Sequence, residues 1–169
     1  MLWTITEFDK KYSRSDFDCG LPKLNEYIKT YISQDLRRGL TRAYVAIDPE
    51  STKIVGYYTL SSAQVGCHEV PDKWKKKVGV YPVPCSLIGR LAVDRTMQGK
   101  GLGEFLLMEA MRRTARLSEE VGIYAMDVFA ISERAKAFYV RYGFVELMDE
   151  ERHLYMHIKT VREAARLMG

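Results

Sequence analysis

Near the N-terminus the spacing of apolar residues changes from that of a strand to that of a helix. Residues 2–8 are β-rich and predict an opening strand. Pro22 then stands where the first turn of a helix tolerates proline, and apolar residues recur behind it at helical spacing. The sequence therefore predicts a helix from Pro22 to about Gly39. Its apolar face consists of Leu21, Leu24, Ile28, Tyr31 or Ile32, and Leu36.

The middle of the chain has the pattern of paired and buried strands. Residues 43–47 and 54–60 are β-rich, and the polar turn residues between them predict a hairpin. Residues 66–86 contain several prolines and predict irregular structure. Residues 87–93 are mainly apolar, which is typical of a strand buried on both faces.

The C-terminal part alternates between helical and strand patterns. Residues 102–117 are amphipathic with helical spacing, and residues 123–129 predict a strand. Ser132 is a candidate N-cap for a short helix that ends near Gly143. A last strand is predicted over residues 153–158, and Thr160-Val-Arg-Glu163 has the form of a capping box for a terminal helix.

This order of elements predicts a single α/β or α+β domain around a mixed sheet. The 169 residues contain no internal repeat, low-complexity tract or long linker, so we expect one domain over residues 1–169. Hydrophobic residues make up 47% and charged residues 28% of the chain, as in ordinary globular domains. The net charge of +4 permits an anionic partner without requiring one.

Composition also indicates the cellular compartment of the protein. No apolar run approaches the roughly 20 residues that a membrane span needs, and the N-terminus lacks the pattern of a signal peptide. The three cysteines have no metal-type spacing. We expect them to be reduced and structural, which predicts a cytoplasmic protein without a metal site.

The candidate chemistry is concentrated between Arg90 and Glu104. Gly99, Gly101 and Gly103 stand between a buried strand and an amphipathic helix. Glycines allow backbone N–H groups to converge on an anion, the helix N-terminus adds partial positive charge, and Lys100 adds charge at the edge. The spacing fits neither G-x-x-x-x-G-K-[ST] nor G-x-G-x-x-G, which disfavours the usual nucleotide loops. A flexible strand-to-helix loop without a ligand remains the alternative.

Two motifs in this order resemble the GNAT family of acetyl-CoA-dependent N-acetyltransferases. Gln98-Gly-Lys-Gly-Leu-Gly103 matches (Gln/Arg)-x-x-Gly-x-(Gly/Ala), and the segment Ala135–Phe144 matches A-x-x-F-Y-x-x-x-G-F. The resemblance covers roughly residues 40–160. It implies the GNAT fold, in which a mixed, mostly antiparallel sheet is splayed at the cofactor site and flanked by helices.

The resemblance also implies roles for particular residues. The pantetheine arm of acetyl-CoA would pair with the backbone of Leu91, Ala92 and Val93. Tyr139 is the candidate catalytic acid, although a core tyrosine would show the same helical spacing. The pyrophosphate of the coenzyme would be bound by Gln98, Gly99, Lys100, Gly101, Leu102 and Gly103.

The chemistry needs a neutral amine and a stabilised thiolate. If both substrates bind together, no acyl-enzyme is required, and a backbone N–H near Val93 is placed to stabilise the developing oxyanion. Tyr139 would protonate the leaving thiolate. Glu69 and Asp127 are the possible bases, whereas His68, His153 and His157 show no distinguishing pattern. A lysine amine, with a pKa of about 10.4, needs a base more than an α-amine of about 7.8, so the sequence favours an acceptor of low pKa.

A narrower resemblance points to the GNAT toxins of bacterial toxin–antitoxin pairs. It implies acetylation of the α-amine of aminoacyl-tRNA, a small ribbon-helix-helix antitoxin and a homodimer. The segments that carry it are Phe17–Gly20 with Leu24-Asn25, Val55–Leu60, Tyr81–Pro84 and Gly89–Val93.

Basic residues supply a candidate RNA surface. Arg37 and Arg38 are clustered at the end of the first predicted helix, where the helix dipole alone also favours them. Arg90 lies in a predicted buried strand and is expected to bind a carboxylate, a dimer partner or an RNA phosphate. A further set, in which the aromatic ring is a candidate for base stacking, is Lys73, Trp74, Lys75, Lys76 and Lys77. A solvated basic loop is the alternative for that segment.

Three functions therefore remain. The first is a tRNA-acetylating toxin, and the second is an acetyltransferase for a small amine, a polyamine or a protein N-terminus. The third is a non-catalytic acyl-CoA-binding module, which Tyr139 and the intact glycine motif disfavour. The basic segment and the narrower resemblance favour the first.

Overall fold

The computed structural model describes residues 3–66, 71–79, 82–147 and 151–168. Its strands are hydrogen-bonded in the order β1-β2-β3-β4-β5-β7-β6. The described pairings are antiparallel except for the parallel pair β4–β5. This mixed, mostly antiparallel sheet confirms the predicted fold class. The strands are β1 (Thr4–Glu7), β2 (Arg42–Ile47), β3 (Ile54–Val65), β4 (Val83–Val93), β5 (Ala125–Phe129), β6 (Val145–Glu146) and β7 (His153–His157).

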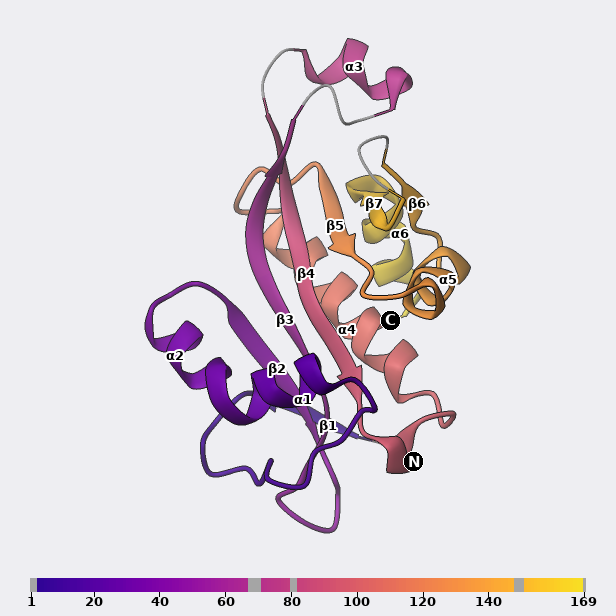
Figure 1. Cartoon of the computed structure of the whole chain (residues 1–169). Coiled ribbons are helices and arrows are strands. Elements are labelled where there is room, and N and C mark those ends of the chain that lie inside the picture. Colours follow the sequence, from indigo (N-terminus) through magenta and orange to yellow (C-terminus); the bar gives the residue numbers. More distant parts are fainter. Residues whose placement is uncertain (1–2, 67–70, 80–81, 148–150, 169) are drawn as a thin grey trace. The chain divides into compact units, whose positions relative to one another are not determined.

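Helices lie between the strands in the chain and follow the last of them (Figure 1). None of those within the described ranges is both long and apolar enough to cross a membrane. The α-helices are α1 (Pro22–Glu26), α2 (Ile32–Arg37), α3 (Asp72–Val78), α4 (Leu102–Leu117), α5 (Glu133–Arg141) and α6 (Ile158–Leu167). A π-helical segment, η1 (Tyr27–Tyr31), connects α1 to α2, and a 3-10 turn, η2 (Arg95–Met97), follows β4.

The chain divides into two compact units. Unit 1 comprises Met1–Ser61 and Gly89–Ala110, and unit 2 comprises Ser62–Ile88 and Met111–Gly169. The elements β3, β4 and α4 therefore each contribute residues to both units.

Unit 1 buries one side of its first helices against its strands. Ile28 and Ile32 are fully buried in a cluster that includes Val45 of β2 and Tyr57 of β3. In Figure 1, α1 lies in front of β2 and β3. The Tyr57 hydroxyl donates a 2.7 Å hydrogen bond to the carbonyl oxygen of Leu24, which satisfies a polar group in this core.

Unit 2 is organised by β5. This strand pairs in parallel with β4 from Cys85↔Ala125 to Ile88↔Val128, and antiparallel with β7 from Ala125↔His157 to Phe129↔His153. Because both faces of the strand are covered, residues 125–128 are all buried.

Several local predictions are confirmed. The hairpin forms from β2 and β3, and the predicted 102–117 helix is α4. The Ser132 hydroxyl accepts a 3.1 Å hydrogen bond from the Ala135 N–H and so caps α5. Gly143 follows the end of this helix with a φ of 103°.

The predicted 22–39 helix forms over residues 22–37 as α1, η1 and α2, although η1 is π-helical. Two local predictions are wrong. Residues 66–86, expected to be irregular, contain α3 and the start of β4. Thr160 is not an N-cap, because β7 leads directly into α6 and the His157 Nδ1 caps that helix by accepting a 3.1 Å hydrogen bond from the Lys159 N–H.

Candidate active site

The glycine loop, residues 98–103, connects β4 to α4 within unit 1. Gly99 and Gly101 have φ values of 77° and 91°, in the left-handed region that favours glycine. A Cβ at either position would meet no atom within 4 Å, so the backbone angle rather than crowding requires glycine there. The open space beside both glycines leaves the main chain of the loop accessible to a ligand.

The N-terminus of α4 adds hydrogen-bond donors to this loop. The Phe105 N–H donates to the Gly101 carbonyl oxygen at 3.0 Å, so the N–H groups of the preceding helical residues have no acceptor within the helix. Together with the helix dipole, these groups favour an anion. The Leu102 side chain anchors this end of the helix on β3. It packs so closely on Gly56 that a Cβ at that position would lie only 3.1 Å away.

Asp94 fixes the turn between β4 and the loop. Its carboxylate is 4% exposed and accepts hydrogen bonds from the Asp18 N–H at 3.0 Å and from the Thr96 N–H at 3.0 Å. Burial alone would raise the pKa of Asp94, but these hydrogen bonds stabilise the carboxylate and the net pKa is lowered. The turn is therefore held by an ionised side chain at neutral pH.

Gln98 ties the loop to two other segments. Its Nε2 donates to the carbonyl oxygen of Val93 at 2.9 Å and to that of Cys19 at 3.0 Å. The side chain thus connects the end of β4 with the segment before α1. Its geometry indicates that Gln98 positions the loop.

The end of β4 is placed for backbone pairing with an extended ligand. In the described residues, the register of β4 with β5 ends at Ile88↔Val128, whereas β4 continues to Val93. Ala92 is buried in the unit 1 core, and Leu91 and Val93 are half-buried. β4 also pairs with β3, so only the edge of this stretch on the β5 side is available for the predicted pairing with pantetheine.

Tyr139 lies in α5 of unit 2 and is 5% exposed. Its ring contacts those of Phe138 and Phe144 with centroid distances of 5.3 and 5.5 Å. Burial raises the pKa of Tyr139, so the phenol stays protonated at neutral pH. Among the described residues its hydroxyl forms no hydrogen bond, which leaves the proton free for a substrate.

A family model for the acetyltransferase (GNAT) domain matches residues 39–146. The chain belongs to the GNAT acetyltransferase family. It is therefore an N-acetyltransferase, and acetyl-CoA is the acetyl donor that the family implies. The glycine loop of this GNAT chain offers the main-chain donors, open space and helix N-terminus that a diphosphate group needs.

Relatives of known character resemble nearly the whole chain. A tRNA-acetylating toxin of Mycobacterium tuberculosis (strain ATCC 25618 / H37Rv) is 32% identical over 88% of this chain and 87% of its own. A crystal structure of a tyrosine-to-phenylalanine mutant of KacT superposes with a TM-score of 0.92 and 33% identity, covering 96% of this chain and 99% of that one. AtaT complexed with acetyl-methionyl-tRNAfMet gives a TM-score of 0.88 and 34% identity, covering 95% of this chain and 98% of that one. Other similar structures hold AtaTR with AcCoA, or AtaT with the C-terminus of the antitoxin AtaR.

Trp74 does not match its predicted role. It is 6% exposed, and its ring packs edge-on against Tyr124, Tyr155 and His157 with centroid distances of 4.8, 4.3 and 5.1 Å. Its ring is therefore enclosed within unit 2, and the prediction that it stacks on a base is wrong. The indole instead anchors α3 to the sheet.

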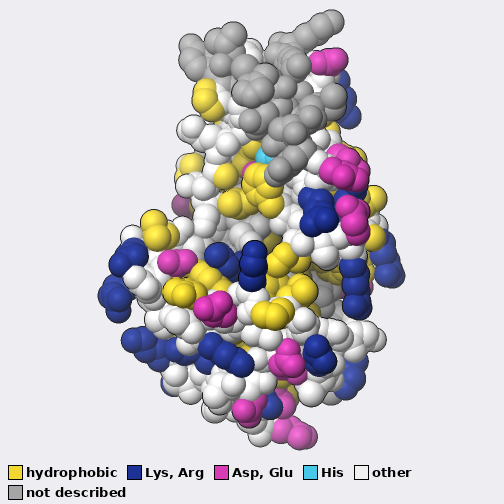
Figure 2. Space-filling model, viewed as in Figure 1, with side chains coloured by type: hydrophobic (Ala, Val, Ile, Leu, Met, Phe, Trp, Pro, Cys, Tyr) yellow, Lys and Arg dark blue, Asp and Glu magenta, His cyan; other side chains and the backbone are white. Residues whose placement is uncertain are grey.

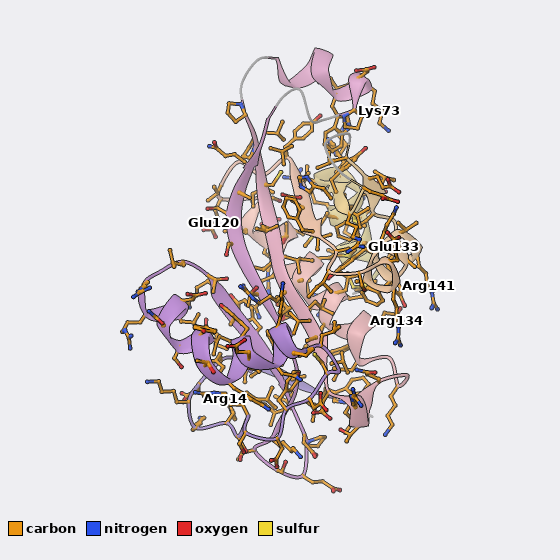
Figure 3. The ribbon with its side chains drawn as sticks, viewed as in Figure 1. Arg14, Lys73, Glu120, Glu133, Arg134 and Arg141 are labelled. Atoms are coloured by element: carbon orange, nitrogen blue, oxygen red, sulfur yellow. The ribbon has the colours of Figure 1, made fainter. Side chains whose placement is uncertain are left out.

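The lysines around Trp74 are only partly described. Lys73 and Lys77 are exposed on α3, and Figure 3 labels Lys73 there. The side chains of Lys75 and Lys76 lie outside the described residues. Lys73 and Lys77 join Lys159 and Arg162 of α6 in a basic cluster around His157, and burial followed by these four charges lowers the pKa of His157. The sequence did not reveal this cluster, because its members come from two helices far apart in the chain.

The arginines at the end of α2 are exposed. Arg37 and Arg38 lie on the solvent side of unit 1, where Figure 2 shows Lys and Arg side chains over α2. Arg42 differs, since its guanidinium forms a 3.1 Å ion pair with Glu7 on β1. Arg37 and Arg38 are the better candidates for an RNA contact.

A buried acid–histidine pair was also missed. The Nε2 of His153 on β7 hydrogen-bonds to the Oδ1 of Asp127 on β5, and both side chains are almost fully buried. Phe129 stacks on the imidazole at a centroid distance of 3.9 Å. A single acidic residue inside the apolar β5 was the only available sequence signal. The other candidate base, Glu69, lies outside the described residues.

The described residues contain no group of three His, Cys, Asp or Glu side chains that would hold a metal ion. Burial raises the pKa of the Cys85 thiol to about 12, so this cysteine is a neutral core residue.

Proposed function

We propose that this chain is a tRNA-acetylating toxin that transfers an acetyl group from acetyl-CoA to the α-amine of an aminoacyl-tRNA and thereby blocks translation. The likeness to AtaT complexed with acetyl-methionyl-tRNAfMet carries this proposal, because it covers 95% of the chain and not only the glycine loop. The curated relative named as a tRNA-acetylating toxin supports the same substrate class.

In this proposal unit 1 binds the coenzyme. The main chain of residues 98–103 and the N-terminus of α4 bind the pyrophosphate, and the backbone of Leu91, Ala92 and Val93 pairs with the pantetheine arm. Lys100 is exposed at the loop and adds positive charge. The hydrogen bonds of Gln98 and the ionised Asp94 hold this arrangement before the ligand arrives.

The reaction is a direct transfer. The neutral α-amine attacks the thioester carbonyl, a C–N bond forms, the C–S bond breaks, and the amine proton passes to solvent. A backbone N–H at Val93 stabilises the developing oxyanion, and Tyr139 donates its proton to the departing thiolate and then regains a proton from solvent. The raised pKa of Tyr139 keeps that proton in place at neutral pH. An α-amine with a pKa of about 7.8 is partly neutral without a dedicated base.

The proposal extends to the partners and the compartment. Aminoacyl-tRNA is a cytoplasmic substrate, so we place the protein in the cytoplasm. A small ribbon-helix-helix antitoxin and a homodimeric state follow from the resemblance to the toxin group, and the structure of AtaT with the C-terminus of AtaR supports the antitoxin.

Labelled acetyl-CoA offered with competing acceptors tests the function. Charged tRNAs, the same tRNAs without amino acid, polyamines and peptides are incubated in parallel with the full chain. We expect label in the charged tRNAs alone, recovered as N-acetylaminoacyl adenosine after nuclease digestion. Label confined to a polyamine or a peptide would overturn the substrate and favour the second function considered above.

A further inference from the structure

Arg90 has an unusual environment for a charged residue in a central strand. It lies in β4 and is half-buried. Its guanidinium carbon lies 3.5 Å from the centroid of the Tyr27 ring, so the cation is in close contact with the aromatic face. An aromatic ring stacked on the flat face of a guanidinium leaves its N–H groups available for hydrogen bonds.

The described residues do not neutralise the charge of Arg90. Among them it forms no ion pair and no hydrogen bond. The acidic residue of this region, Asp35, instead accepts a 2.9 Å hydrogen bond from the Tyr27 hydroxyl. Because removing a cation from water is costly, a half-buried arginine without a carboxylate is poised for an external anion.

Tyr27 holds the guanidinium in place. The ring is 4% exposed and stacks on Tyr57 at a centroid distance of 6.4 Å and an interplanar angle of 18°. Burial and the hydrogen bond to Asp35 raise the pKa of Tyr27 to about 12, so the ring stays neutral. The Ile32 N–H donates to the Tyr27 carbonyl oxygen, the bond pattern of the π-helical segment η1. The main chain and the side chain of Tyr27 are thus both fixed.

The residue before Arg90 has no space for a side chain. Gly89 is exposed, and a Cβ at this position would lie 2.9 Å from the Thr59 Oγ1. The Thr59 side chain is fully buried, and its hydroxyl has no partner among the described residues. Beside Arg90 the strand therefore presents bare main chain.

We propose that Arg90, positioned by Tyr27, binds a phosphate of the acceptor end of the RNA substrate. This inference rests on the proposed function. In an aminoacyl-tRNA the amino-acid carboxyl group is an uncharged ester, so the anions nearest to the reacting amine are backbone phosphates. Arg90 lies three residues before Val93, about 10 Å along a strand. A guanidinium fork matches two phosphate oxygens.

Three acceptors with the same amino acid test the inference. They are the charged tRNA, a charged CCA trinucleotide, which has phosphates, and aminoacyl-adenosine, which has none. For the wild-type chain and Arg90→Gln, kcat/KM is measured on each at saturating acetyl-CoA. We expect the ratio of trinucleotide to adenosine to fall about tenfold to a hundredfold in Arg90→Gln, mainly through KM. An unchanged ratio would overturn the inference.

Further variants separate binding from folding. A ratio between two acceptors does not depend on how much of a variant folds. Tyr27→Leu, which removes the ring, is expected to lower the ratio severalfold, and Arg90→Lys, which keeps the charge without the fork, to restore it only in part. Arg14 is the matched control, since its guanidinium lies 5.1 Å from the Phe8 ring in the same unit, and Arg14→Gln should keep the wild-type ratio (Figure 3).

Failure of this inference is distinct from failure of the proposed function. A wild-type chain that acetylates none of the charged acceptors overturns both. A wild-type chain that acetylates them, with Arg90→Gln losing activity equally on the trinucleotide and the adenosine, overturns only the phosphate contact.

Discussion

The side-chain amide of Gln98 donates a 2.9 Å hydrogen bond to the carbonyl oxygen of Val93, at the end of the preceding strand. The same nitrogen reaches the Cys19 carbonyl oxygen at 3.0 Å. One side chain therefore fixes the glycine loop to the strand proposed to pair with pantetheine. The two parts of the proposed coenzyme site are therefore joined before any ligand binds.

Gln98→Leu should weaken acetyl-CoA binding about tenfold, because two carbonyl oxygens lose their donor and the loop loses its anchor. Isothermal titration calorimetry measures the dissociation constant. Gln64→Leu, at an exposed glutamine of β3, is the matched control and should bind as the wild type does. Equal affinities for the wild type and Gln98→Leu would show that the loop keeps its shape without this side chain.

Tyr139→Phe should retain acetyl-CoA affinity and lower kcat about a hundredfold or more, because the ring keeps its packing and only the proton donor is lost. Steady-state kinetics and calorimetry separate the two effects. Since burial raises the pKa of Tyr139, wild-type turnover should show no loss from its deprotonation up to pH 9 or so. Tyr142→Phe, at the end of the same helix, serves as the control, and unchanged turnover in Tyr139→Phe would exclude the acid role.

His157 should make the protein less stable in mild acid. Its pKa is lowered in the folded state, so below the unfolded value of about 6.5 the unfolded chain binds a proton that the folded chain excludes. The free energy of unfolding is therefore unaffected by His157 above that pH and falls as pH drops toward the folded pKa. Protonation also removes the Nδ1 acceptor that caps α6. Urea unfolding between pH 5 and pH 8 measures the slope.

Two substitutions at His157 distinguish titration from capping. His157→Asn keeps a capping side chain without a proton site, so the slope between pH 5 and pH 7 should flatten, while stability at neutral pH falls only through the lost ring contact with Trp74. His157→Ala should flatten the slope and also cost about 1 kcal/mol of unfolding free energy through the lost cap. A slope that persists in both variants would assign the acid sensitivity to another group.

The basic cluster around His157 should contribute to RNA binding. Replacing both Lys73 and Lys77 by Gln removes two exposed charges, and each lost phosphate contact should reduce the slope of log K against log salt by about 0.7 to 0.9. Filter binding of tRNA at several salt concentrations gives this slope, and acetyl-CoA affinity should stay the same. Lys10→Gln with Lys11→Gln, in unit 1, is the control of equal charge. If both double variants bind tRNA alike, the α3 lysines are ordinary surface residues.

Local signals in the sequence predicted much of the fold. The β2–β3 hairpin depends on turn residues, α4 on amphipathic spacing, and the start of α5 on the Ser132 cap. Each of these signals lies within a short segment of the sequence. The two motifs likewise placed Gln98 and Tyr139. The π-helical segment was not predictable in this way, because Leu24, Ile28 and Leu36 satisfy an ordinary helical period as well.

Contacts between distant segments account for what was missed. Trp74 was placed on an RNA surface because three lysines follow it, yet its burial depends on Tyr124, Tyr155 and His157. The stacking of Arg90 on Tyr27 and the pairing of His153 with Asp127 likewise depend on strand and helix placement. Residue types alone cannot reveal such pairs.

The π-helical segment helps to determine which side chains of this helix face the sheet. One residue contributes about 100° of rotation in a helix, and the wide turn at η1 accommodates a residue that a regular turn would not. Deleting one residue within η1 would therefore remove the wide turn and rotate the helix that carries Tyr27 relative to the strand of Arg90.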